Sequence, residues 1–81
     1  MKLTEFDLEK EIAGEQFYRF PNTTVTVCAL KLVNGMTLIG HSACLDPKNY
    51  SETVGQAIAR DKAKEQLWEL LAFRAYDEKN K

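Results

Sequence analysis

Cys28 and His41 are the side chains of this sequence best suited to chemistry, because a thiolate beside an imidazole can form a nucleophile and its base. They stand in two β-rich runs that flank Asn34-Gly35, the strongest short-range signal for a two-residue type I′ hairpin. Such a turn would place Cys28 opposite His41 on one face of the hairpin. No orienting carboxylate shares that face, and cysteine is a common small core residue. We therefore expect the pair to be packing, with a nucleophilic cysteine or a metal site shared between subunits as alternatives.

Other reactive side chains are more simply interpreted as structural. Two cysteines and one histidine are too few for a four-ligand zinc site in one chain, and we expect Cys28 and Cys44 to be reduced and unpaired. Asp46 and Glu52 suit the start of a helix, where negative charge is favourable. Asp61 could make an ion pair at an interface or remain a solvated charge. We expect no catalytic residue, metal or cofactor.

A nucleotide-like ligand is a further possibility. Phe17 and Tyr18 could stack on a base, while Arg19, Arg60 and Lys62 could bind phosphate. The alternative is that the aromatic side chains anchor this segment to the core and that the basic residues lie on a solvated helix flank. The glycine spacing matches no nucleotide-binding loop.

Composition indicates one ordinary globular domain, residues 1–81. The chain is 44% hydrophobic and 28% charged, with a formal net charge of −1, which argues against a nucleic-acid partner. A chain of 81 residues buries only about 60–65% of its extended surface, so self-association is expected. The acidic N-terminus does not resemble a signal peptide, and no apolar run approaches the ~18–20 residues of a membrane span. We expect a cytoplasmic protein without membrane contact.

The elements that must position these residues define an α+β fold. Residues 1–23 are expected to form a short N-terminal helix, with Thr4 and Asp7 in a capping box and Gly14 as C-cap, followed by an extended arm. Residues 24–45 form a central antiparallel β-hairpin turning at Asn34-Gly35. Residues 46–50 are a helix-capping turn, residues 51–73 a long C-terminal helix that begins after Ser51 or Asn49 and packs on one sheet face, and residues 76–81 a frayed tail.

The long helix carries two apolar stripes at helical spacing, which predicts two neighbours. The wider stripe comprises Gly55, Ala59, Ala63, Leu67, Leu70 and Leu71. Its three small residues predict close approach of another backbone. The narrower stripe comprises Val54, Ala57, Trp68 and Ala72, with Asp61 beside it. Both hairpin faces are largely apolar, so the face not covered by the helix and the Trp68 stripe together predict a homo-oligomer, most simply a two-fold dimer.

Residues 24–73 resemble a widespread family of small tailed-phage and prophage proteins. The resemblance rests on a T-V-C strand, an L-x-N-G hairpin, the run G-x-S-A-C-x-D-P-x-N-aromatic from Gly40 to Tyr50, and a Trp-Glu-Leu helix at residues 68–70. His41 stands where an acidic or polar residue is usual. The segment after Leu70 also departs from the family's pattern. The resemblance implies a phage accessory protein of uncharacterised function, with no catalytic residue to transfer.

These observations predict a non-enzymatic phage or prophage accessory protein, a small homo-oligomeric interaction module that binds a host protein. The expected interface is Val54, Ala57, Asp61, Trp68 and Ala72. The main alternative is an oligomeric sponge that sequesters a nucleotide-like signalling ligand at a subunit interface. A cysteine- or metal-dependent enzyme is a remote alternative.

Overall fold

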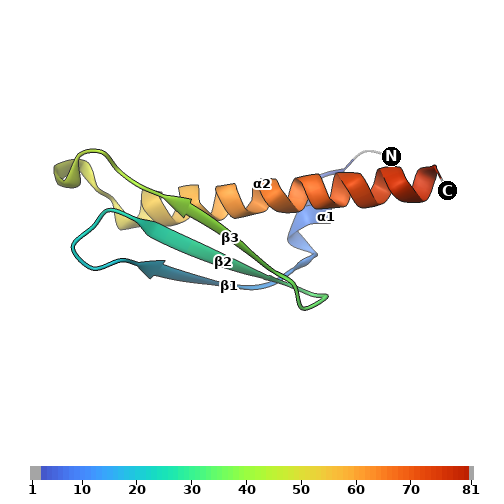
Figure 1. Ribbon diagram of the computed structural model, residues 1–81, viewed down its shortest axis with the longest axis horizontal. Coiled ribbons are helices and arrows are strands. Elements are labelled where there is room, and N and C mark those ends of the chain that lie inside the picture. The colour runs from blue at the N-terminus through green and yellow to red at the C-terminus, as the bar shows by residue number, and fades with distance from the viewer. Residues whose placement is uncertain (1–2, 81) are drawn as a thin grey trace.

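A computed structural model describes residues 3–80 as a three-stranded antiparallel sheet with one long helix along one face (Figure 1). The elements are α1 (Glu5–Glu9), β1 (Ile12–Arg19), β2 (Thr26–Leu32), β3 (Thr37–Ser42), the 3₁₀ turn η1 (Pro47–Asn49) and α2 (Glu52–Lys79). The strand order is β1-β2-β3, and α2 packs on β2 and β3. The predicted α+β class is confirmed. Residues 1–2 and 81, the outer ends of the predicted N-terminal segment and tail, lie outside the described residues.

The N-terminal segment forms a shorter helix than predicted and then a strand. The capping box of Thr4 and Asp7 is present and starts α1, but α1 ends at Glu9. Gly14, expected as a C-cap, instead lies in β1 at a register shift in its pairing with β2. The expected extended arm is thus largely an edge strand, because pairing with β2 satisfies its backbone and lets Ile12 and Phe17 pack against the core.

The hairpin turns at Asn34-Gly35 with a register one residue away from the prediction. Leu32 donates its amide to the Met36 carbonyl at 2.8 Å, so three residues form the loop. Gly35 has φ +93°, the left-handed residue that follows a type I turn in three-residue hairpins. The predicted two-residue turn is therefore wrong.

The register change turns every side chain of β3 to the opposite face from the one predicted. Because side chains alternate along a strand, a slip of one residue exchanges the two faces. Leu38 lies on the helix side and is 5% exposed, whereas Ile39 points away from α2 and is 51% exposed. Gly40 lies opposite Cys28, and His41 lies opposite Val27.

The helix α2 begins after the predicted cap Ser51 and runs to Lys79, beyond the expected end at Phe73. Its buried residues follow a four-residue step: Gly55, Ala59, Ala63, Leu67 and Leu71. Leu70 was predicted to be buried with them but is 41% exposed. It directly precedes Leu71 in the helix, so its side chain is rotated by about 100° around the helix axis from that buried residue. The C-terminal residues 76–79 are helical rather than frayed, and α2 extends past the hairpin tip (Figure 1).

The predicted close approach on α2 is made to β3. A Cβ atom at Gly40 would overlap the Ala59 carbonyl oxygen and the Ala63 amide nitrogen, and would lie 3.0 Å from the Ala63 Cα. Two alanines and a glycine thus let the helix backbone lie directly on the strand. The larger buried side chains Leu30 and Leu67 belong to the same core cluster as these two alanines.

Candidate functional site

Cys28 and His41 are not neighbours in the structure. Cys28 is fully buried between β2 and α2, and burial raises the pKa of its thiol. His41 is exposed on the other face of the sheet. The predicted Cys28–His41 pairing is therefore wrong, because it depended on the incorrect hairpin register. Among residues 3–80, no group of three or more His, Cys, Asp or Glu side chains is placed to hold a metal ion.

The two thiols should differ strongly in their reaction with iodoacetamide. We expect native protein to be alkylated at Cys44, which is half-buried, and protected at Cys28, whereas both thiols should react in urea. Mass spectrometry after timed labelling measures this, with Cys28→Ala as the control that assigns the protected site. That variant should cost on the order of 1 kcal/mol of unfolding free energy. Faster labelling of Cys28 in native protein than in urea would contradict its assignment as a core residue.

The five candidate residues for a nucleotide-like ligand do not converge within one chain. Phe17 lies opposite Cys28 on the helix side of the sheet, while its neighbour Tyr18 lies opposite Val27 on the other side. The Arg19 guanidinium lies over the Tyr50 ring, 4.3 Å from its centroid.

The two candidate basic residues of α2 also diverge. Arg60 makes ion pairs with Glu9 and Glu15 on the side of α1. Lys62 lines a pocket with Ile39 and His41 on the other flank of α2. The five side chains therefore present no common cation–aromatic surface on a single copy.

Arg60 and Lys64 of α2 form a cluster of ion pairs with acidic residues of α1. The Arg60 guanidinium donates to both oxygens of Glu9, at 2.9 and 3.2 Å, and also to Glu15. The Lys64 ammonium pairs with Glu5 and lies 2.8 Å from the Glu9 carboxylate. The hydrogen bonds from Arg60, followed by that from Lys64, lower the pKa of Glu9 from 4.5 to about 2.

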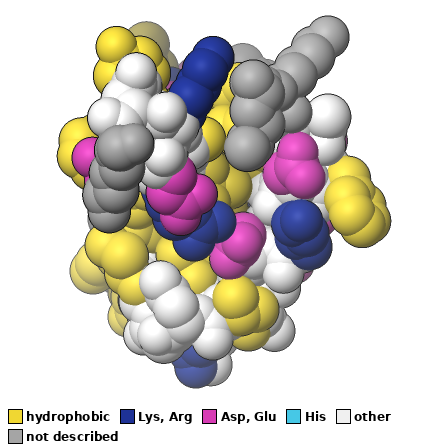
Figure 2. Space-filling model, turned by 90° about the vertical axis from the view of Figure 1, so that its right-hand side faces the viewer, with side chains coloured by type: hydrophobic (Ala, Val, Ile, Leu, Met, Phe, Trp, Pro, Cys, Tyr) yellow, Lys and Arg dark blue, Asp and Glu magenta, His cyan; other side chains and the backbone are white. Residues whose placement is uncertain are grey.

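Sequence reasoning missed this cluster, although a signal for it exists. Arg60 and Lys64 are four residues apart, as are Glu5 and Glu9, so each pair lies on one side of its helix. Arg74 adds a further pair with Glu11 at 3.1 Å. Figure 2 shows the end of the molecule near both termini, where basic and acidic side chains lie among hydrophobic ones. Only tertiary structure shows that the two helices meet through these charges.

The predicted interface residues of α2 all lie exposed. Val54, Ala57, Asp61, Trp68 and Ala72 are exposed along the helix, away from the buried ridge. Ile58 and Tyr76 extend the same side and are also exposed. We call these seven residues the outer stripe of α2.

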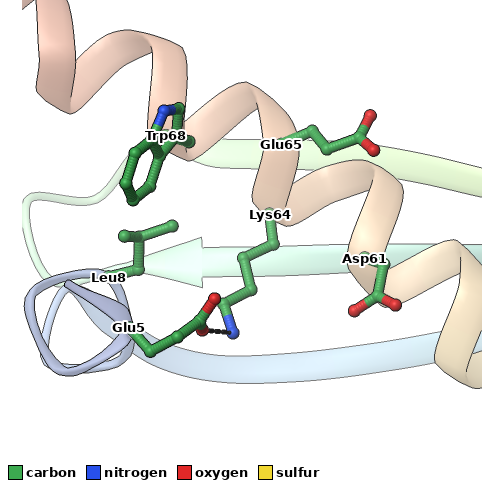
Figure 3. A pocket seen from close by; sticks show the side chains of 6 residues that line it. All are labelled: Glu5, Leu8, Asp61, Lys64, Glu65 and Trp68. Atoms are coloured by element: carbon green, nitrogen blue, oxygen red, sulfur yellow. Dashed lines mark ion pairs between the residues drawn. The ribbon is translucent and has the colours of Figure 1, made fainter. Parts of the chain in front are cut away.

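A pocket of about 380 Å³ lies where the outer stripe meets α1. Its lining residues are Glu5, Leu8, Asp61, Lys64, Glu65 and Trp68. In Figure 3 the indole of Trp68 lies over Leu8, and Lys64 reaches from α2 to Glu5. The Trp68 side of the pocket is thus apolar, and carboxylates form much of the remaining wall.

The sheet face opposite α2 is a second surface with exposed apolar side chains, which lie beside the polar Gln16 and His41. Tyr18 and Ile39 are 56% and 51% exposed there, beside the half-buried side chains of Val27 and Ala29. The ring of Tyr18 contacts that of Phe20 edge-to-face, with centroids 5.1 Å apart. We call Tyr18, Val27, Ala29 and Ile39 the open sheet face.

Residues 3–78 match the model of the "Phage protein (N4 Gp49/phage Sf6 gene 66) family". No curated protein and no solved structure shows significant similarity to the chain. None of the helices described within residues 3–80 is long and apolar enough to cross a membrane.

Proposed function

This chain belongs to the phage protein family named above, and from that membership we propose that it is a non-enzymatic accessory protein that binds a host protein in the bacterial cytoplasm. The observation that carries the proposal is the exposure of two separate apolar surfaces, the outer stripe of α2 and the open sheet face. Large exposed apolar patches on small domains mark sites of protein contact. Trp68, 44% exposed beside a pocket, is the type of residue that dominates binding energy at such contacts.

We assign the two surfaces to different contacts. The open sheet face carries uncharged apolar side chains at its centre, Val27 and Ala29 between Tyr18 and Ile39, and suits association with a second copy. The outer stripe of α2 carries Asp61 within it and lies beside the pocket. It is the surface proposed for the host protein.

The sponge alternative receives less support. Phe17 and Tyr18 lie on opposite sheet faces, and Arg60 already pairs with Glu9 and Glu15. A ligand contacting all the candidate residues would need side chains from several copies. The interaction module requires only surfaces already present on one copy.

Capture from bacterial lysate tests the proposal with three immobilised proteins. Wild type and Ile39→Asp should retain the same specific host protein, and Trp68→Ala should lose it. Light scattering on the same samples should give twice the 9.2 kDa chain mass for wild type and Trp68→Ala, but a monomer for Ile39→Asp. Circular dichroism verifies that each variant is folded.

Two results would contradict the proposal. Identical recovery of every captured protein by wild type and Trp68→Ala would contradict the assignment of the outer stripe of α2 to the host protein. A monomeric wild-type protein at micromolar concentration would contradict the proposed dimer through the open sheet face.

A further inference from the structure

The pocket beside Trp68 differs electrostatically from the ion-pair cluster next to it. Glu5 and Glu9 are compensated by Lys64, and Arg60 adds a second cation to Glu9. Asp61 and Glu65 line the same pocket one helical turn apart, yet neither makes an ion pair or hydrogen bond with a described residue. Two carboxylates without such a partner therefore lie on the turns of α2 that precede the half-exposed Trp68, with their oxygens directed away from the indole (Figure 3).

This combination suits a basic side chain on an otherwise apolar segment. A guanidinium or ammonium group over a Trp face gains a cation–π interaction. The carboxylates of Asp61 and Glu65 can pair with a second cation about one helical turn away. The methylene stem of such a side chain can pack on the exposed part of Trp68, whose indole covers the buried Leu8 (Figure 3).

The charge pattern disfavours a second copy of this chain at the outer stripe. Antiparallel pairing of two α2 helices that matches Val54 with Ala72 also matches Ile58 with Trp68, which would be favourable. The same register places Asp61 opposite Glu65 of the other copy, once on each side of the two-fold axis. Four carboxylates would then meet at the centre of the interface, where like charges are destabilising. The stripe is complementary to a partner that supplies cations.

We infer that the Trp68 pocket and the outer stripe of α2 bind an amphipathic segment of a partner protein, with the stem of an arginine or lysine side chain on Trp68 and its charged end directed toward Asp61 or Glu65. This inference deepens the proposed function and rests on it: it specifies the chemistry of the host partner's contact. The partner's apolar side chains would lie on Val54 and Ile58.

Tryptophan fluorescence tests this directly, because Trp68 is the only tryptophan in the chain. The probes are two synthetic amphipathic helices of about 18 residues, one built from Leu and Arg and the other from Leu and Glu in the same pattern. The Leu–Arg peptide should shift the Trp68 emission saturably, whereas the Leu–Glu peptide should not. The double variant Asp61→Lys, Glu65→Lys should weaken Leu–Arg binding by about tenfold or more.

A matched control separates this site from overall charge. The double variant Glu69→Lys, Glu78→Lys changes the net charge by the same amount at two exposed positions outside the pocket. It should bind the Leu–Arg peptide within about twofold of wild type. Equal weakening in both double variants would overturn the inference in favour of general charge attraction, as would equal binding of both peptides. Trp68 emission that changes with protein concentration alone would overturn it in favour of a second copy.

The outcome also separates this inference from the proposed function. If lysate capture depends on Trp68 but the Leu–Arg peptide fails to bind, the interaction module stands and the basic segment is wrong. If the peptide binds as expected but lysate yields no specific protein, the pocket's preference stands and the host-binding function is contradicted.

Discussion

Gly40→Ala should strongly destabilise this protein, although it adds only one methyl group. The new Cβ would overlap the Ala59 carbonyl oxygen and the Ala63 amide nitrogen, both backbone atoms that cannot rotate away. The helix would have to move off β3 along its buried ridge. We expect a loss of about 3 kcal/mol or more in unfolding free energy, at the upper end of overpacking costs. For a domain of this size, that corresponds to a fall in Tm of roughly 12–24 °C.

Thermal and urea unfolding followed by circular dichroism measure this loss. Gly14→Ala is the matched control, because it adds the same methyl group in β1, where no atom beyond the adjoining residues lies within 4 Å of the new Cβ. The control should change stability by less than about 1 kcal/mol. Equal midpoints for the two variants would mean that the Gly40 contact with α2 is not as close as the structure shows.

Arg60→Met should weaken the contact between α1 and α2. Methionine keeps much of the side chain's apolar length but removes the hydrogen bonds to Glu9 and Glu15. The carboxylates are partly solvated, so the pairs are worth less than their pKa shift implies. We expect a loss of about 1–2 kcal/mol in unfolding free energy. Lys62→Met removes the same charge from an exposed position and should cost less than about 0.5 kcal/mol.

The pH dependence of stability gives an independent measure of the same contact. The folded pKa of Glu9 is about 2 and its ordinary value is 4.5, so the unfolded chain binds more protons between these values. The stabilisation from Glu9 is therefore complete above about pH 4.5 and is lost as the pH falls towards 2. In Arg60→Met this part of the acid-induced loss should shrink, since only Lys64 still lowers the pKa. An unchanged slope of stability against pH in Arg60→Met would contradict the assigned contact.

Several elements follow from local residue patterns. Thr4 and Asp7 form a capping box that needs only neighbouring backbone, and Ser51 caps α2 in the same local way. Asn34-Gly35 places the hairpin turn because a left-handed residue favours glycine. The four-residue step of small residues on α2 predicts that another backbone approaches there, and the structure places β3 at that position.

Other features depend on contacts between segments far apart in the chain. Residues 12–19 can extend equally well as an arm, and only the free edge of β2 makes them a strand. From the sequence, Arg60 cannot be distinguished from a solvated charge on a helix. Its ion pair with Glu9 depends on the packing of α1 beside α2. Residues 76–79 resemble a frayed tail in the sequence, although α2 continues through them, past the ion pair between Arg74 and Glu11.

The hairpin register shows most clearly what sequence alone determined and what tertiary structure decided. Asn34-Gly35 specifies a turn but is compatible with both a two-residue and a three-residue loop. The choice decides whether Leu38 or Ile39 faces α2, and both are apolar, so alternation within the strand cannot distinguish them. Packing does distinguish them, because only the three-residue loop places the side-chain-free Gly40 under Ala59 and Ala63. The sequence alone thus determined where the chain turns and caps its helices, while close packing of α2 on the sheet decided which side chains became core and which became surface.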